Sequence, residues 1–139
     1  MTTSLKHPPL ARVTVEEGQK WLNALVELWN AEKRDIAAMA SFATSDCETH
    51  YGDLPILRSR AEMESMLEKR FSGFTYYRLK KTVRMASENM LAVDLDIRWS
   101  GTASNGEMRR SRALEFLTFR DGYACKWELV SCLAPPDLP

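Results

Sequence analysis

The sequence predicts an α+β fold, a cone-shaped α+β barrel in which three helices pack on a curved, mostly antiparallel sheet. Capping motifs and helically spaced apolar residues occupy the first half of the chain, up to Gly73. Four long segments of alternating apolar and polar residues follow, where Asn105-Gly106 and Asp121-Gly122 predict hairpin turns. A chain of 139 residues is the size of one domain. We place this domain at 14–139, after an N-terminal arm of residues 1–13.

Each predicted helix begins at a residue whose side chain can accept a hydrogen bond from the first turn. Thr14 with Glu17 and Ser59 with Glu62 are capping boxes, and Asp35 can cap a shorter helix. Apolar residues then recur at helical spacing. The predicted helices are about 15–30, a short one from Asp35 to near Phe42, and a third after Ser59 that Gly73 closes.

The segment "CETHY" (47–51) predicts a short first strand ahead of a group of turn residues. Alternation places Glu48 and His50 on one face of this strand and the other three residues on the opposite face. The remaining four strands should form an antiparallel meander. They are predicted at 74–86, 90–100, 107–119 and 123–133.

The chain carries 19 basic and 19 acidic residues, so it has no net charge with which to hold a polyanion or an anionic membrane surface. We therefore expect no nucleic-acid partner and no membrane partner. The basic segments "RLKK" (78–81) and "RRSR" (109–112) are interpreted as solvated strand faces. The start lacks the apolar core of a signal peptide, and no apolar run is long enough to span a membrane. A soluble, cytoplasmic protein is the expectation.

No motif in the sequence predicts a metal or another cofactor. The three cysteines are far from metal-ligand spacing and fall in predicted strands, so we expect reduced thiols. Cys47, Glu48 and His50 could offer ligands to a metal, but alternation turns Cys47 to the opposite face of its strand. The sequence also has no glycine-rich phosphate loop and no Ser/His/Asp nucleophile motif.

Three segments are similar to motifs of the nuclear transport factor 2-like superfamily, which includes ketosteroid isomerase and the SnoaL-like polyketide cyclases. They are "SFATSDCETHY", "RSRAEMESML" and "FLTFRDGYACKWELV". The order of predicted elements over about 14–133 also resembles this superfamily. The resemblance implies a cavity between sheet and helices, and a homodimer formed through the uncovered sheet face. It implies the fold more strongly than the function, because one fold can host unrelated activities.

The resemblance also implies site residues. The position of the base in ketosteroid isomerases falls on His50, and the position of their neutral-acid hydrogen-bond donor falls on Glu115. The helix-one tyrosine of those enzymes falls near Leu25 or Val26, which cannot donate a side-chain hydrogen bond. The aspartate that many SnoaL-like cyclases carry in the last strand falls near Cys132. The known acid/base schemes are therefore matched only in part.

Both implied catalytic residues suit acid/base chemistry. An unperturbed imidazole, with a pKa of about 6.5, would let His50 act as a general base at neutral pH. Both nearby arginines lie at odd offsets in the strand and cannot pair with Glu115 directly. Without a cationic partner from another strand, the apolar neighbours of Glu115 predict a neutral carboxyl group. The alternatives are a structural His50 bonded to backbone or to Glu48, and a Glu115 paired with an arginine at the sheet surface.

Aromatic residues offer an apolar wall to a ligand, although core packing would account for each of them separately. The expected substrate-binding residues are Trp21, Leu25, Tyr76, Trp99 and Trp127. Asp94 and Asp96 alternate with an apolar set and are expected on the outer sheet face, matched by arginines on neighbouring strands.

These observations predict a cofactor-independent acid/base enzyme of the isomerase, cyclase or dehydratase type. Its substrate would be an apolar small molecule that contains a carbonyl group, with His50 as the base and Glu115 as the group that holds the oxyanion. The alternative is a non-catalytic module of the same fold, for small-molecule binding or assembly. A cavity reached by both residues would favour the enzyme.

Overall fold

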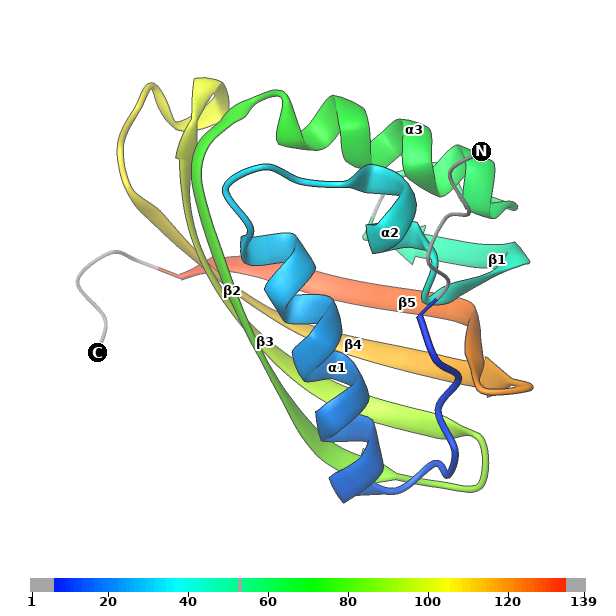
Figure 1. Cartoon of the computed structure of the whole chain (residues 1–139). Coiled ribbons are helices and arrows are strands. Elements are labelled where there is room, and N and C mark those ends of the chain that lie inside the picture. The colour runs from blue at the N-terminus through cyan, green and yellow to red at the C-terminus, as the bar shows by residue number, and fades with distance from the viewer. Residues whose placement is uncertain (1–6, 53, 135–139) are drawn as a thin grey trace.

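The computed structural model describes residues 7–52 and 54–134 of the chain. The three predicted helices pack against a five-stranded sheet (Figure 1). The helices are α1 (Val15–Asn30), α2 (Ile36–Ala40) and α3 (Arg60–Phe71), with a 3₁₀ turn, η1, at Thr102–Ser104. The strands are β1 (Ala43–Tyr51), β2 (Phe74–Ala86), β3 (Met90–Gly101), β4 (Arg109–Arg120) and β5 (Tyr123–Ala134).

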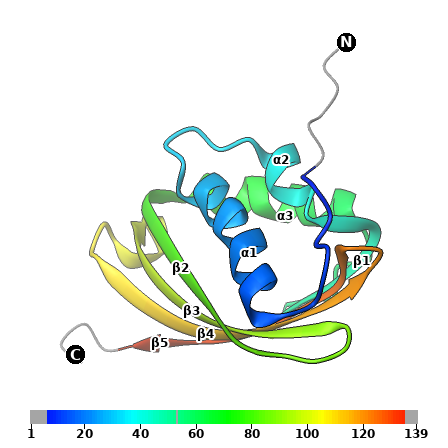
Figure 2. The same ribbon diagram turned by 60° about the horizontal axis from the view of Figure 1, so that its bottom comes forward.

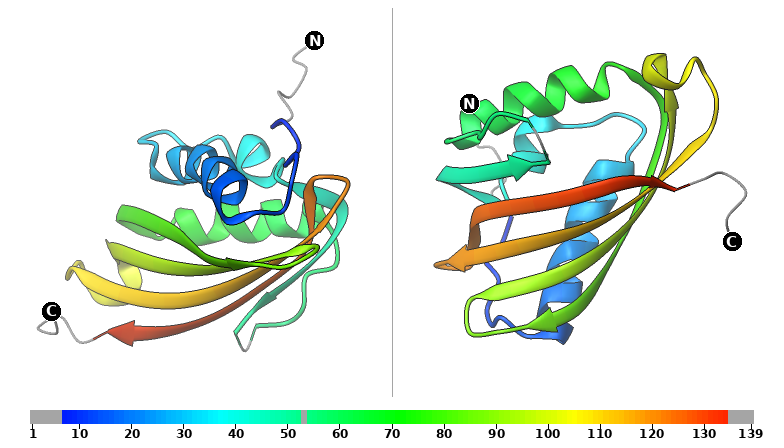
Figure 3. Two further views of the ribbon diagram at one scale, coloured as in Figure 1. Left: turned by 90° about the horizontal axis from the view of Figure 1, so that it is seen from below. Right: turned by 180° about the vertical axis from the view of Figure 1, so that it is seen from behind.

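The strand order in the sheet is β1-β5-β4-β3-β2. Strands β2 to β5 form the predicted antiparallel meander, whereas β1 pairs in parallel with β5. The helices lie on the concave face of the sheet (Figure 2), and in the described part of the chain no helix covers its convex face (Figure 3). The predicted α+β class is thus confirmed. The sheet does not close into a barrel, because β1 and β2 remain its edges.

The helices begin where their capping residues predict. The side chains of Thr14, Asp35 and Ser59 each accept a hydrogen bond at 3.1 Å from a backbone N–H in the first turn of α1, α2 and α3, respectively. The apolar stripe of α1 is buried against the sheet. It consists of Trp21, Leu22, Leu25 and Trp29. This stripe packs α1 against the concave face of the sheet.

The first strand is longer than predicted and extends over Ala43–Tyr51 instead of 47–51. Its first half is partly exposed and polar, so alternation does not reveal it in the sequence. Within this half Ala43 pairs with Ala124 of β5, and the register shifts between Ala43 and Glu48. The parallel pairing depends on a contact between distant parts of the chain.

The turn at Asp121-Gly122 positions the N-terminal arm. Both residues have positive φ, 54° and 84°, as the predicted Asp-Gly hairpin requires. A Cβ atom on Gly122 would lie only 2.9 Å from the carbonyl oxygen of Leu10, whose N–H donates to the carbonyl of Gly122 at 2.8 Å. His7 stacks on Phe42 with ring centroids 4.0 Å apart. Residues 7–10 of the predicted arm therefore lie against the domain.

The convex face carries the predicted ion pairs between strands. Arg110 on β4 donates two hydrogen bonds to Asp96 on β3, at 3.1 and 3.0 Å. Asp94 pairs with Arg84 at 2.8 Å. The expectation that arginines of neighbouring strands match these aspartates is confirmed. Among the described helices, none combines the length and the apolar character needed to cross a membrane.

Candidate active site

A cavity of about 290 Å³ lies between the concave sheet face and the helices. Helices α1 and α3, the end of β1 and the four strands of the meander all contribute to its wall. Apolar and polar side chains both contribute to the wall. Its polar side chains belong to Tyr51, Arg70, Tyr77, Lys81, Ser111 and Glu115.

Lys81 and Glu115 meet in this wall. The Nζ atom of Lys81 lies 2.6 Å from Oε1 of Glu115, and the two side chains are only 2% and 1% exposed. The other carboxylate oxygen, Oε2, accepts a hydrogen bond from Nε1 of Trp127 at 2.7 Å. Because β3 lies between β2 and β4, the two side chains approach each other across the concave surface of β3.

Burial and mutual attraction act on this pair in opposite directions. Burial lowers the pKa of the Lys81 ammonium, and the contact with Glu115 offsets part of this effect. The rings of Trp127 and Trp29 lie 4.9 and 6.0 Å from Nζ, at distances typical of cation–π contacts. One proton transfer along the 2.6 Å hydrogen bond converts the ion pair into a neutral amine and a neutral acid.

Two phenol groups line the same cavity. Burial raises the pKa of Tyr77 to about 12 and also raises the pKa of Tyr51, while the positive charge of Arg70 opposes both changes. Both phenols therefore stay protonated at neutral pH and can donate a hydrogen bond. Within residues 7–52 and 54–134, neither hydroxyl has a hydrogen-bond partner. An oxygen atom of a bound molecule could accept from them.

His50 lies outside this wall. It follows Thr49 and precedes Tyr51 in β1, and alternation turns its side chain to the opposite face of the strand. There Nε2 is 2.8 Å from Oε1 of Glu48, a hydrogen bond that lowers the pKa of Glu48. The side chain of His50 is 30% exposed. The structure thus brings Glu115 but not His50 to the cavity, and the catalytic role of His50 stays a prediction.

Of the five residues expected to bind substrate, Trp127 lines the cavity. Trp21 and Leu25 are buried in the core at other positions. Tyr76 is exposed, and Trp99 is half-buried with its Nε1 bonded to Ser111 at 3.0 Å. These four residues do not belong to the cavity wall that the structure describes. Strand alternation already separates Tyr76 from Tyr77, which does line the cavity.

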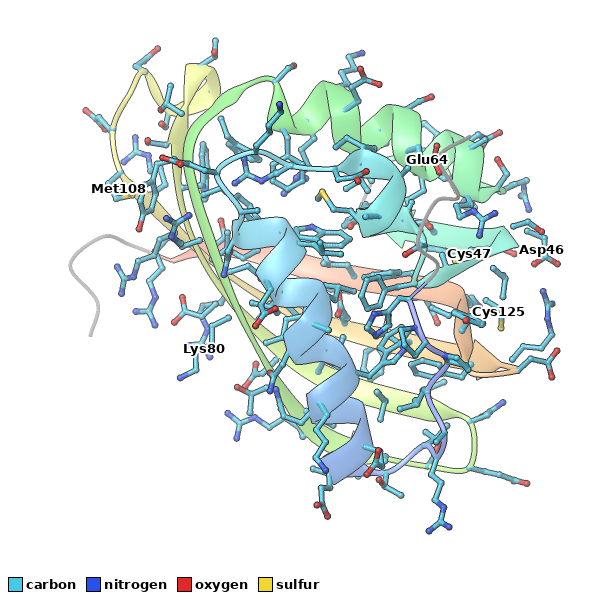
Figure 4. All side chains as sticks on the ribbon, in the orientation of Figure 1. Asp46, Cys47, Glu64, Lys80, Met108 and Cys125 are labelled. Atoms are coloured by element: carbon cyan, nitrogen blue, oxygen red, sulfur yellow. The ribbon has the colours of Figure 1, made fainter. Side chains whose placement is uncertain are left out.

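Sequence interpretation missed Lys81. The segment "RLKK" was expected on a solvated face, which holds for Lys80, whose side chain points away from the helices (Figure 4). It is wrong for Lys81, which alternates with the buried residues Tyr77, Leu79 and Val83. This alternation could have placed Lys81 on the buried face of its strand from the sequence. Lys81 is a cationic partner of Glu115 from another strand, so the condition set for a neutral Glu115 is not met.

The described residues offer no metal site, since no three His, Cys, Asp or Glu side chains are grouped to hold an ion. Cys47 and Cys125 are free thiols. Burial raises the pKa of Cys47 to about 11, which disfavours the reactive thiolate. The side chain of Cys132 lies outside the described residues. The polar chemistry of the cavity is therefore that of an amine, a carboxyl group, a guanidinium and hydroxyls.

A model of the SnoaL-like domain family matches residues 22–127, which is most of the chain. The chain belongs to the SnoaL-like domain family. The matched part of this SnoaL-like domain contains Lys81, Glu115 and Trp127. No curated protein matches the sequence.

Solved structures share the fold of this SnoaL-like domain. AclR, a candidate hydroxylase from Streptomyces galilaeus, matches with a TM-score of 0.70 and 20% identity over 90% of each chain. A candidate SnoaL-like polyketide cyclase from Jannaschia sp. CCS1 matches with a TM-score of 0.70 and 12% identity, over 86% of this chain and 87% of that one. TerC, co-crystallised with polyporic acid, matches with a TM-score of 0.63 and 18% identity, over 77% of this chain and 86% of its own. At these identities the similarity shows the fold.

Proposed function

We propose that this SnoaL-like domain is a cofactor-independent acid/base enzyme of the isomerase, cyclase or dehydratase type. The observation that carries the proposal is the buried Lys81–Glu115 pair in the wall of a cavity. A buried ion pair is often no more stabilising than well-packed apolar residues of similar volume. Titratable groups perturbed by burial and by a charged partner gather at functional sites. Both arguments favour a chemical role for the pair over a purely structural one.

The proposed reaction begins with a proton transfer inside the pair. When the proton of Lys81 passes to Glu115, Nζ becomes a neutral amine in the cavity wall. This amine can then take a proton from a carbon atom next to the carbonyl group of a bound substrate. Burial supports this step because it lowers the pKa of Lys81 toward the operating pH. Glu115 returns its proton to the rearranged product at another carbon or at oxygen.

The two phenols are proposed to stabilise the oxyanion that forms in this step. Tyr51 and Tyr77 line the cavity with the proton pair, and both stay protonated because burial raises the pKa of each phenol. Hydrogen-bond donors that are already oriented toward a developing negative charge lower the barrier most in a site that excludes water. In this scheme the phenols take the oxyanion role that the sequence analysis gave to Glu115.

An apolar substrate is supported by the surroundings of the pair. The rings of Trp29 and Trp127 form part of the wall. A groove of about 710 Å³ between α3 and the loop after β1 shares Tyr51, Leu54 and Arg70 with the cavity. Its other lining residues are mostly apolar, so it offers an entry route for an apolar molecule. A small-molecule ligand is also supported by fold neighbours such as a candidate polyketide cyclase and TerC with polyporic acid.

The test uses 2-tetralone, an apolar ketone with acidic protons beside its carbonyl group. NMR in deuterated buffer measures the rate at which these protons exchange. Wild-type protein should accelerate exchange by about 10²- to 10⁴-fold, the usual contribution of general acid/base catalysis. Lys81→Met should abolish this acceleration, and Lys80→Met, which changes the adjacent exposed lysine, should retain it.

Exchange no faster in the wild type than in the Lys81→Met variant would overturn the acid/base function. Binding of 2-tetralone without exchange would then favour the non-catalytic binding module.

A further inference from the structure

We infer that Lys81 is a nucleophile as well as a proton carrier, and that it forms an iminium with an aldehyde or ketone bound in the cavity. The inference rests on the proposed function for the presence of a carbonyl compound beside Lys81. It goes beyond that function by adding a covalent intermediate between enzyme and substrate. The ligand class narrows accordingly to unhindered apolar aldehydes and ketones.

The placement of Lys81 favours this chemistry. Among the described residues that line the cavity, it contributes the one primary amine. Its Nζ atom is held at a fixed position by Glu115 at 2.6 Å and by the ring of Trp127 at 4.9 Å. Lys80, next to it in the chain, is exposed on the other face of β2. A lysine that is desolvated in an apolar pocket is an activated amine nucleophile.

Glu115 supplies the proton that the reaction needs. After the proton of Lys81 has passed to Glu115, the lone pair of Nζ attacks the carbonyl carbon and a C–N bond forms. A proton moves from nitrogen to the former carbonyl oxygen, which gives a carbinolamine. Glu115 then protonates the hydroxyl group, which leaves as water while the nitrogen lone pair forms the C=N bond. No oxidant or reductant is required, because one ammonium group and one carbonyl group yield one iminium and one water.

The charge of the buried site is the same before and after this reaction. The resting site holds the Lys81 ammonium beside the Glu115 carboxylate, and the product holds an iminium at the same nitrogen beside the same carboxylate. The rings of Trp127 and Trp29 face the cation in both states. No additional charge is buried, so the usual desolvation cost of creating a cation in an apolar cavity does not arise. The carboxylate can next remove a proton from the adjacent carbon, which yields an enamine.

The test traps the iminium with sodium cyanoborohydride in the presence of 2-tetralone. Reduction converts the iminium into a stable secondary amine that carries one tetralinyl group. Peptide mass spectrometry then locates the modified lysines. At neutral pH and limiting ketone, Lys81 should be modified about tenfold faster than the exposed Lys80 or more, because burial lowers the pKa of the Lys81 ammonium and so favours the free amine. The Lys81→Arg variant keeps a cation beside Glu115 but cannot form an imine, and it should lose this modification.

A Lys80→Arg variant serves as the matched control and should retain the modification at Lys81. Modification of Lys81 no faster than that of Lys80 would overturn the inference. If the wild type still accelerates proton exchange in that case, the proposed acid/base function stands without the covalent step. If neither exchange nor modification occurs, both proposals fail.

Discussion

Nζ of Lys81 lies 2.6 Å from Oε1 of Glu115, although 34 positions and the whole of β3 separate the two residues in the chain. Both side chains are almost completely buried, so the two charges depend on each other. Removing one partner of a buried ion pair leaves an uncompensated charge, which typically costs about 3–5 kcal/mol. Replacing both partners with apolar residues is often neutral.

The first prediction is a double-mutant cycle on this pair. Lys81→Met should lower the free energy of unfolding by about 3–5 kcal/mol, and the double variant Lys81→Met/Glu115→Leu should recover most of the loss. Urea denaturation measures all four proteins of the cycle, which are the wild type, Lys81→Met, Glu115→Leu and the double variant. Lys80→Met is the control and should stay within about 0.5 kcal/mol of wild type, because it changes an exposed residue. Additive effects of the two changes would show that the pair is not coupled.

The second prediction concerns the phenol of Tyr77. Tyr77→Phe should slow the exchange of 2-tetralone by about 10²- to 10³-fold, the usual loss when one oxyanion donor is removed. The melting temperature should change little, because the hydroxyl bonds to no residue in the described part of the chain. Tyr76→Phe, at the adjacent exposed position, should exchange at the wild-type rate. Equal rates for Tyr77→Phe and wild type would remove the phenol from the proposed mechanism.

The third prediction tests whether His50 is the catalytic base. Sequence analysis predicts that His50→Ala abolishes turnover, whereas the cavity geometry predicts that exchange of 2-tetralone is retained. We expect retention, because the side chain of His50 bonds to Glu48 on the face of β1 opposite to Tyr51. The melting temperature should stay within a few degrees, since the imidazole is partly exposed. Loss of exchange in a folded variant would restore His50 as the base.

A fourth prediction is a pH dependence of stability that comes from the N-terminal arm. His7 stacks on Phe42 and packs edge-on against Trp21, and burial lowers its pKa. The folded state therefore binds the proton less readily than the unfolded state. The contribution of His7 to the free energy of unfolding is complete when the pH is above about 6.5, the pKa of a histidine in the unfolded chain. This contribution is lost as the pH falls from that value to the lower pKa of His7 in the folded state.

The measurement is the free energy of unfolding in urea between about pH 8 and pH 5 for wild type and for His7→Phe. The phenyl ring keeps the stacking on Phe42 but cannot be protonated. The wild type should lose more stability than the variant on acidification. If the stability of the two proteins fell equally with pH, His7 would be excluded as the source of the pH dependence.

The fifth prediction is a homodimer formed through the convex sheet face. Leu114, Phe116 and Val130 are 52%, 38% and 68% exposed, and Leu114 pairs with Val130 between β4 and β5. Apolar side chains gathered on a face without helices are typical of an association surface. Sedimentation should give twice the chain mass of 15.9 kDa, and Leu114→Asp should give the monomer. A wild-type monomer at micromolar concentration would contradict this prediction.

Much of the fold could be predicted from local signals in the sequence. The caps at Thr14, Asp35 and Ser59 set the starts of the helices, because each requires only a side chain and a backbone N–H a few residues away. Asp121-Gly122 set a hairpin turn because the required φ angles suit those residues. Alternation also separated the two faces of each strand. Such signals act over a few residues and do not depend on the rest of the chain.

The tertiary structure decided which of these faces lines the cavity and which charges meet there. Alternation separates His50 from Tyr51, but only the packing of β1 beside β5 turns Tyr51 toward the helices. A shift by one residue exchanges the two faces of a strand, so a register counted from a motif cannot settle this point. Lys81 and Glu115 meet because the sheet curves and brings β2 and β4 together over β3. That contact depends on the shape of the whole sheet, which no short segment of sequence contains.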